Sequence, residues 1–175
     1  MAIVLVIVGV AVGGVFGVVV LVYPLAHREE IRAAAVRFDV DADLIASVIH
    51  AESRFREGQV SHRGAVGLMQ IMPATAVFIG DKIGIANADE VLDIPSFNIT
   101  LGTAYLRYLL DKFGDLETAL FAYNAGEGKV AKWMATDDFG RMEDGRRVLV
   151  RSPYPGANEY VRRVMGNRRF YSWRI

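Results

Sequence analysis

The chain has 175 residues, a formal net charge of zero and no cysteine. Without cysteine it can form no disulfide, no thiolate metal site and no cysteine nucleophile, and no lipid can be attached through a cysteine. Zero net charge also excludes the strong overall basic field that attracts nucleic acid, so we expect no nucleic-acid partner.

The first 26 residues differ from the rest of the chain because they carry no charged side chain. Residues 2–23 are a continuous apolar run, and about 20 such residues suffice for one helix to cross a bilayer. A cleavable secretory signal usually starts with a basic residue and has a shorter apolar core, of roughly 7–15 residues. We therefore predict an uncleaved transmembrane helix in residues 1–26, followed by one domain in residues 27–175.

Two further expectations concern this anchor. Gly9, Gly13 and Gly17 recur at four-residue spacing, a pattern that lets two membrane helices approach closely, so a homodimer is one possibility. Arg28 and Arg32 flank the C-terminal side of the apolar run, which by the positive-inside rule favours a cytoplasmic location for the following domain.

The domain after the anchor is expected to be mainly α-helical, because no alternating run rich in Val and Ile recurs. Pro73 is placed as the first residue of a helix, Gly114 as the end of one, and Asp41 and Asp115 as caps. Residues 136–156 mix Asp, Gly, Arg and Pro and should form a long loop with a small hairpin. The expected helices cover residues 27–38, 42–53, 73–80, 98–113, 116–124, 129–135 and 157–173.

Glu52 occupies an unusual place in its helix, because the apolar stripe before it continues onto this residue. The stripe consists of Leu44, Ile45, Val48 and Ile49. Burial and the negative end of the helix dipole would both raise the pKa of a carboxyl group there. A carboxylic acid that keeps its proton near neutral pH can act as the general acid in glycoside cleavage. Alternatively, the side chain turns outward and pairs with a neighbouring arginine.

Three later segments bear on this choice: "GLMQ" at residues 67–70, "AYNAG" at residues 122–126 and "EYV" at residues 159–161. Together with "AESRF" and "GAVGLMQIMPATA", and in this order, they resemble the catalytic domain of the soluble-type lytic transglycosylases, which are related to goose-type lysozymes. The resemblance covers nearly all of residues 28–171. It implies a lysozyme-like helical fold with a glycan cleft.

The resemblance also implies a reaction. It would be cleavage of the β-1,4 bond between N-acetylmuramic acid and N-acetylglucosamine in peptidoglycan, in which the sugar's own 6-hydroxyl closes a 1,6-anhydro ring. Glu52 would be the single acid and base, the Tyr160 hydroxyl would bond to its carboxylate, and the Asn124 amide would hold the N-acetyl group. The expected substrate-binding residues are Ser53, Met69, Gln70, Tyr123, Asn124 and Tyr160.

Two departures from the family pattern leave alternatives open. Glu127 stands where the family more often has proline, and a second carboxylate there could serve a goose-type muramidase that hydrolyses with water. Gly156 and Ala157 replace the Glu-Thr that commonly precedes the final tyrosine, which weakens the role given to Tyr160. A non-catalytic module that only docks on peptidoglycan is the other alternative.

No metal or other cofactor is expected, because His27, His50 and His62 are scattered along the chain. The partners implied by the resemblance are peptidoglycan glycan strands, with the membrane reached through the N-terminal helix. Since peptidoglycan lies outside, the domain is expected on the outer face of a bacterial cytoplasmic membrane. A long domain can be translocated despite flanking arginines.

Overall fold

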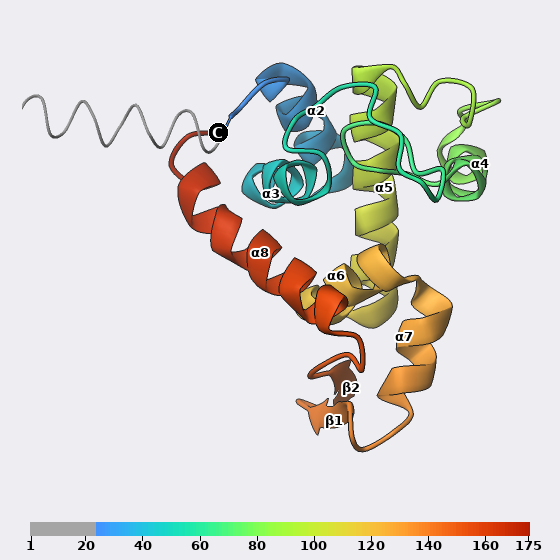
Figure 1. Ribbon diagram of the computed structural model, residues 1–175. Coiled ribbons are helices and arrows are strands. Elements are labelled where there is room, and N and C mark those ends of the chain that lie inside the picture. The colour runs from blue at the N-terminus through green and yellow to red at the C-terminus, as the bar shows by residue number, and fades with distance from the viewer. Residues whose placement is uncertain (1–23) are drawn as a thin grey trace, which may run out of the picture.

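The computed structural model describes residues 24–175, which form a mainly helical domain, as the sequence predicts (Figure 1). Its elements are α2 (Arg28–Phe38), α3 (Ala42–Glu52), α4 (Pro73–Ile83), α5 (Pro95–Phe113), α6 (Leu116–Ala125), α7 (Glu127–Met134), β1 (Gly140–Glu143), β2 (Arg146–Leu149) and α8 (Pro155–Tyr171).

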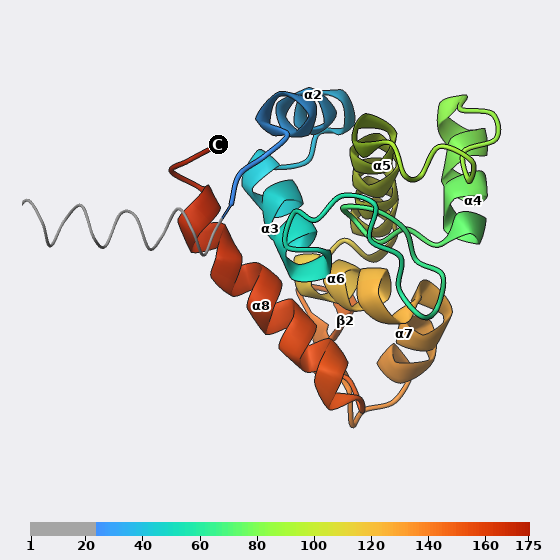
Figure 2. The ribbon, with the colours of Figure 1, turned by 45° about the horizontal axis from the view of Figure 1, so that its top comes forward.

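Helix α5 runs through the middle of the domain, and α2, α4 and α6 pack against it (Figures 1 and 2). The long helix α8 lies along α3 and α6, on the side of the molecule away from α4. Strands β1 and β2 form the expected antiparallel hairpin, which packs near α6 and α7. The loop from residue 53 to residue 72 crosses in front of α5 and joins α3 to α4.

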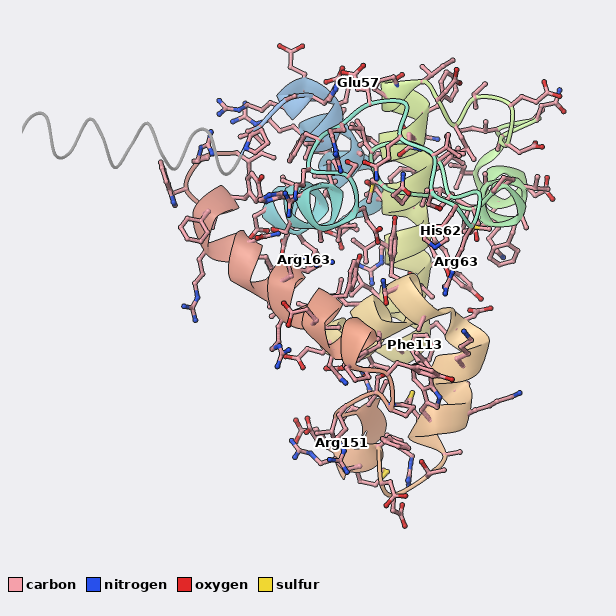
Figure 3. All side chains as sticks on the ribbon, in the orientation of Figure 1. Glu57, His62, Arg63, Phe113, Arg151 and Arg163 are labelled. Carbon is pink, nitrogen blue, oxygen red and sulfur yellow. The ribbon has the colours of Figure 1, made fainter. Side chains whose placement is uncertain are left out.

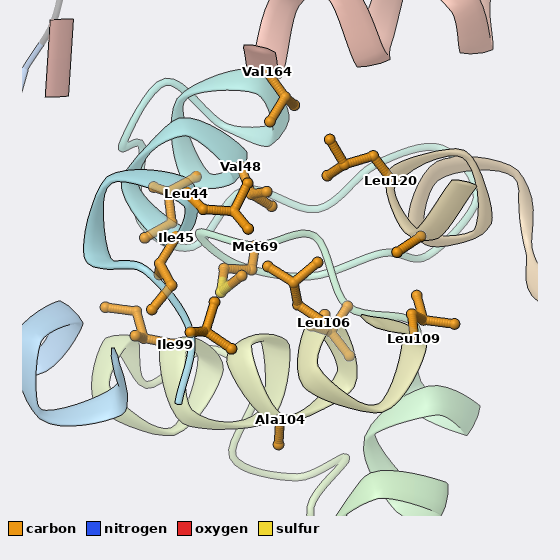
Figure 4. Close-up of a cluster of buried hydrophobic side chains, with 14 of the residues drawn as sticks. Leu44, Ile45, Val48, Met69, Ile99, Ala104, Leu106, Leu109, Leu120 and Val164 are labelled. Atoms are coloured by element: carbon orange, nitrogen blue, oxygen red, sulfur yellow. The ribbon is translucent and has the colours of Figure 1, made fainter. Parts of the chain in front are cut away.

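The apolar face predicted for α3 is confirmed by its burial. Leu44, Ile45, Val48 and Ile49 are each at most 3% exposed. Figure 4 shows side chains of α3 meeting those of α5, α6 and α8, with Met69 from the loop between α3 and α4. Each buried aliphatic side chain of this kind stabilises the fold by about 1.5–3 kcal/mol, so this cluster holds the C-terminal end of α3 in place.

Local sequence signals explain where most helices begin and end. Proline is the first residue of α4, α5 and α8, where its missing N–H costs no hydrogen bond. Asp115 caps α6, since its carboxylate accepts from the backbone N–H of Thr118 at 2.8 Å. Gly114 ends α5 in the left-handed conformation that glycine adopts readily.

Two local expectations differ from the structure. Helix α4 does not stop near Gly80 but continues to Ile83, because the left-handed residue that ends it is Gly84. Asp41 directly precedes α3 but makes no side-chain cap. Its carboxylate instead accepts a hydrogen bond from Arg168 of α8 at 2.9 Å, so the charge joins two helices rather than ending one.

The predicted membrane helix and its glycines Gly9, Gly13 and Gly17 lie outside the described residues. Within residues 24–175, none of the helices is both long enough and apolar enough to cross a bilayer. The start of the described chain is fixed to the domain, because the Tyr171 hydroxyl donates a 2.9 Å hydrogen bond to the Pro24 carbonyl.

Candidate active site

Glu52 is the last residue of α3 and lies where two cavities meet. The smaller, of about 400 Å³, is bounded by Gln70 of the loop before α4 and by Tyr123 and Asn124 of α6. The larger, of about 780 Å³, opens toward α8. Among residues 24–175, no carboxylate other than that of Glu52 lines either cavity. A chain-like substrate that occupies both cavities would therefore pass one acid.

Burial raises the pKa of the Glu52 carboxyl from 4.5 to about 7, because the charged form is poorly solvated there. Hydrogen bonding from Tyr160 and the positive charge of Arg163 lower the pKa and offset part of this effect. The predicted rise in pKa is thus confirmed. A carboxyl group with a pKa near 7 can donate a proton and take one back at neutral pH.

Tyr160 comes from α8, and its side chain is almost completely buried. Within the described part of the chain, its hydroxyl has no hydrogen-bond partner of standard length and angle, although it lies close enough to Glu52 to lower that pKa. The hydrogen bond between Tyr160 and Glu52 is therefore long or poorly aligned in the free protein, as catalytic hydrogen bonds often are before substrate binds. Burial and the Glu52 charge raise the pKa of Tyr160 well above its usual range, so the hydroxyl keeps its proton.

The turn at residues 67–70 is held by Asn98, a fully buried residue of α5. Its side-chain oxygen accepts from the Met69 N–H at 2.8 Å, and its amide nitrogen donates to the carbonyls of Val66 and Leu92 at 2.9 and 2.8 Å. A side chain at Gly67 would collide with Asn98. Sequence reasoning missed Asn98, whose only signal is a polar residue on an otherwise apolar helix face.

Gln70 reaches the wall of the smaller cavity from this turn, with a left-handed backbone (φ 50°). Its amide nitrogen donates to the Gly67 carbonyl at 2.8 Å and to the Gln59 carbonyl at 2.9 Å. These two bonds fix the orientation of the amide. The prediction that Gln70 lies at a glycan cleft fits its position.

Tyr123 and Asn124 end α6 beside the same cavity. The Asn124 side chain is exposed, whereas Tyr123 is half-buried and its ring packs against that of Tyr105, with ring centroids 5.4 Å apart. Tyr105 of α5 also lines the cavity. It was not predicted, because a tyrosine on a long amphipathic helix has no distinctive pattern.

Ser53 and Met69 were expected in the cleft, but the structure places both behind its wall. Each is fully buried, and neither lines a cavity next to Glu52. The Ser53 hydroxyl donates to the Ile49 carbonyl at 3.2 Å, at the C-terminal end of α3. Met69 points into the core against Gly102 of α5, and only its backbone faces the site. These residues therefore support the cavity wall.

Glu127, the candidate second carboxylate, begins α7 and forms an ion pair with Lys112 at 2.8 Å. Its side chain is 37% exposed and lines neither cavity at Glu52. Between residues 24 and 175, no three His, Cys, Asp or Glu side chains gather closely enough to hold a metal ion. The chemistry that the described site itself offers is acid–base chemistry at Glu52.

Comparison with known proteins identifies the family. Residues 29–143 match the family model described as the transglycosylase SLT domain, so the chain belongs to this family. It is 42% identical over 107 residues to the transglycosylase of Enterobacteria phage PRD1, which covers 61% of this chain and 37% of the phage protein. It is 30% identical over 155 residues to the soluble lytic murein transglycosylase of Escherichia coli, covering 86% of this chain and 24% of that protein.

The fold has solved counterparts. The lytic transglycosylase Slt of Pseudomonas aeruginosa, solved as an inactive variant with one glutamate changed to glutamine, matches with a TM-score of 0.73 and 31% identity. The match covers 86% of this chain and 24% of the Pseudomonas chain. The predicted lysozyme-like helical domain is therefore confirmed for the described residues. The chain spans about a quarter to a third of the length of these relatives.

Proposed function

We propose that the chain is a peptidoglycan lytic transglycosylase, which cleaves the β-1,4 bond between N-acetylmuramic acid and N-acetylglucosamine and leaves 1,6-anhydromuramic ends. One observation carries the proposal: Glu52, with a pKa of about 7, is the one carboxylate that the described residues place on either cavity wall. Retaining and inverting glycosidases generally use two carboxylates flanking the bond, whereas ring closure by an internal hydroxyl requires one.

In the proposed reaction, protonated Glu52 gives its proton to the glycosidic oxygen as the bond from that oxygen to C1 of muramic acid breaks. The resulting Glu52 carboxylate then accepts the proton of the 6-hydroxyl while O6 forms the new bond to C1. The proton is returned and no water is consumed. Glu52 must therefore act first as acid and then as base, and a pKa near neutrality suits both steps.

The other site residues have positioning roles in this scheme. Gln70 and Asn124 offer amide groups on the wall of the smaller cavity, where they can bind sugar hydroxyl or N-acetyl groups. The Tyr160 hydroxyl, a donor at all physiological pH values, would stabilise the Glu52 carboxylate formed in the first step. Ser53, Met69 and Tyr123 hold the cavity wall in shape.

A digestion assay with a matched pair of variants tests the proposal. The full chain in detergent is incubated with purified bacterial cell-wall sacculi, and released fragments are followed over time. We expect Glu52→Gln to lower the rate by about 10²–10⁴-fold, because the general acid is lost. Glu57→Gln, a nearby glutamate that pairs with His27 at the surface, should keep the wild-type rate. Equal rates for all three proteins would contradict the proposed role of Glu52, and binding without release would indicate a docking module.

The location of the protein forms a second part of the proposal. The apolar residues 2–23 would anchor the chain in the cytoplasmic membrane, with the domain on the outer side where peptidoglycan lies. Protease added to intact spheroplasts should then digest the domain. Full protection until the membrane is broken would contradict this placement. Cysteine crosslinking along the apolar segment tests the dimer suggested by Gly9, Gly13 and Gly17, which requires crosslinks on one helix face only.

A further inference from the structure

Three arginines line the larger cavity beside Glu52, which we call the arginine cavity. Arg54 and Arg56 follow Glu52 in the chain, and Arg163 extends from α8 on the side that faces α3 (Figure 3). Among residues 24–175, no carboxylate lies within ion-pair distance of any of the three. Three cations therefore share one cavity with the single carboxyl group of Glu52.

Neighbouring arginines on the same helix behave differently. Arg162 pairs with Glu159 at 2.5 Å, and Arg168 pairs with Asp41 and Asp43 at 2.9 and 3.0 Å. Two other arginines of α8 are thus balanced by carboxylates, whereas Arg163 at the cavity is not. Like charges held close together repel each other, and an anion bound between them would relieve that repulsion.

The backbone after α3 directs two of these side chains to the cavity. Arg54 and Phe55 both have left-handed backbones, with φ of 54° and 61°, which is unfavourable for residues other than glycine. Phe55 is buried and packs on Tyr171, with ring centroids 6.0 Å apart. Because Phe55 turns inward, its neighbours Arg54 and Arg56 turn outward. Arg56 is fixed further by donation from Nε to the Ser53 carbonyl at 3.1 Å.

Arg163 is also held in place, since its guanidinium lies over the ring of Tyr160, 5.9 Å from the centroid. The other ionisable groups at the cavity supply at most part of one negative charge, from Glu52. Burial and the nearby Arg54 and Arg163 lower the pKa of His50, which stays neutral near pH 7, and the raised pKa of Glu52 keeps much of it protonated. The cavity is therefore strongly positive at neutral pH.

We propose that the arginine cavity binds carboxylate groups of the peptidoglycan substrate, and so selects which glycan strands reach Glu52. This inference rests on the proposed function. Glu52 lines both cavities. When the scissile bond of a glycan strand lies at Glu52, the part of the substrate next to that bond therefore lies in the arginine cavity. Guanidinium groups match carboxylates in geometry and form strong charge-assisted hydrogen bonds. The volume of about 780 Å³ leaves room for more than the carboxylate alone.

Two parts of the substrate carry suitable carboxylates. One source is the stem peptide attached to the lactyl group of muramic acid. The other is the lactyl carboxylate itself, which is free only where the peptide has been removed. Three soluble substrates separate these sources: peptide-bearing glycan, peptide-free glycan, and peptide-bearing glycan whose carboxylates have been converted to neutral amides.

The test measures kcat/KM on all three substrates for the full chain in detergent. The double variant Arg54→Gln/Arg163→Gln removes two charges, and Arg169→Gln is the matched control, an exposed arginine of α8 that does not line the cavity. We expect the double variant to lose about tenfold in kcat/KM, mainly through KM, on a substrate with the recognised carboxylate. On the amidated glycan it should equal the wild type when both are assayed at about pH 5.5, where Glu52 is protonated in both proteins. The control should match the wild type throughout.

Each outcome decides between the sources or rejects the inference. A loss confined to peptide-bearing glycan identifies the stem peptide, and a loss confined to peptide-free glycan identifies the lactyl carboxylate. No loss on either, or the same loss on the amidated glycan, overturns the proposal. So does a double variant that keeps wild-type kinetics but binds soluble glycerol phosphate, the headgroup of phosphatidylglycerol, more weakly than the wild type, because the arginines would then bind lipid headgroups.

A binding measurement separates failure of this inference from failure of the proposed function. The Glu52→Gln chain is titrated calorimetrically with a soluble peptide-bearing disaccharide and with the corresponding peptide-free disaccharide. The same titration is repeated with a Glu52→Gln chain that also carries Arg54→Gln and Arg163→Gln. These changes should weaken binding of the more tightly bound disaccharide about tenfold. If the wild-type chain cleaves nothing, this titration still shows whether the cavity binds carboxylates. If both proteins bind the disaccharides with equal affinity, the inference is overturned.

Discussion

The Tyr123 hydroxyl donates a 2.9 Å hydrogen bond to the backbone carbonyl of Met69. This bond joins the end of α6 to the turn at residues 67–70, two segments that are 54 positions apart in the chain. Gln70, the next residue, and Tyr123 both line the smaller cavity. The turn at residues 67–70 and the end of α6 thus form one wall of the smaller cavity. The backbone of the buried Met69 is where the two segments are connected.

Replacing Tyr123 with phenylalanine should test this connection. The change removes the hydrogen bond and leaves a partly buried carbonyl without its donor, which costs about 1–3 kcal/mol of unfolding free energy. Urea denaturation measures the loss. Tyr108→Phe is the control, because the Tyr108 hydroxyl contacts only the exposed Lys112 and its removal should cost less than about 0.5 kcal/mol. Equal effects of the two changes would contradict the structural role of Tyr123.

Asn98→Leu should be more damaging than Tyr123→Phe. It removes three hydrogen bonds at once and leaves the Met69 N–H and the Leu92 carbonyl without these partners, while the Val66 carbonyl keeps the bond from the Ile71 N–H. We expect a loss of roughly 3–5 kcal/mol in unfolding free energy, or failure to fold. Asn98→Asp would place a carboxylate oxygen against the Val66 and Leu92 carbonyls in a fully buried position. It should therefore also destabilise the fold, and more strongly as the pH rises and the buried carboxyl group ionises.

The raised pKa of Glu52 predicts how stability depends on pH. Between pH 4.5 and about 7, the folded protein keeps a proton that the unfolded chain has released, so the unfolding free energy falls as pH rises. The full penalty, about 3 kcal/mol, is present above pH 7 and absent below the unfolded pKa. Glu52→Gln lacks this penalty. Its stability gain over the wild type should therefore grow between about pH 4 and pH 8, and a constant difference would contradict the raised pKa.

Activity should follow the same titration in the proposed mechanism. Because the reaction starts with protonated Glu52, kcat/KM should fall as pH rises through about 7. Arg163→Gln removes a positive charge that lowers this pKa and should move the fall to higher pH. Arg169→Gln again serves as the control and should leave the profile in place. A rate that rises above pH 7 would contradict the role of Glu52 as general acid.

Glu127 allows a direct test of the hydrolytic alternative. Its carboxylate is tied to Lys112 and lies outside both cavities, so Glu127→Gln should change the rate by less than about threefold and should not change the product. The chemical identity of the sugar ends is measured by mass spectrometry. A large loss of reducing-end product in this variant would instead assign Glu127 as a base.

Sequence patterns predicted the helical class because apolar spacing, proline positions and glycine stops act locally. The half-buried, inward-facing position of Glu52 could be predicted for the same reason, since the stripe from Leu44 to Ile49 continues onto it. What could not be predicted depends on contacts between distant segments. Ser53 and Met69 carry motif positions but face inward, and Asn98 has a role only because the turn at residues 67–70 folds onto α5.

The most direct test of the central claim, that Glu52 alone supplies the acid and the base, is mass spectrometry of the glycan ends. The full chain in detergent digests peptidoglycan, with Glu52→Gln and Glu57→Gln alongside. The account predicts 1,6-anhydromuramic ends from the wild type and from Glu57→Gln, and none from Glu52→Gln. Reducing ends from the wild type, or anhydro ends from Glu52→Gln at the wild-type rate, would contradict it.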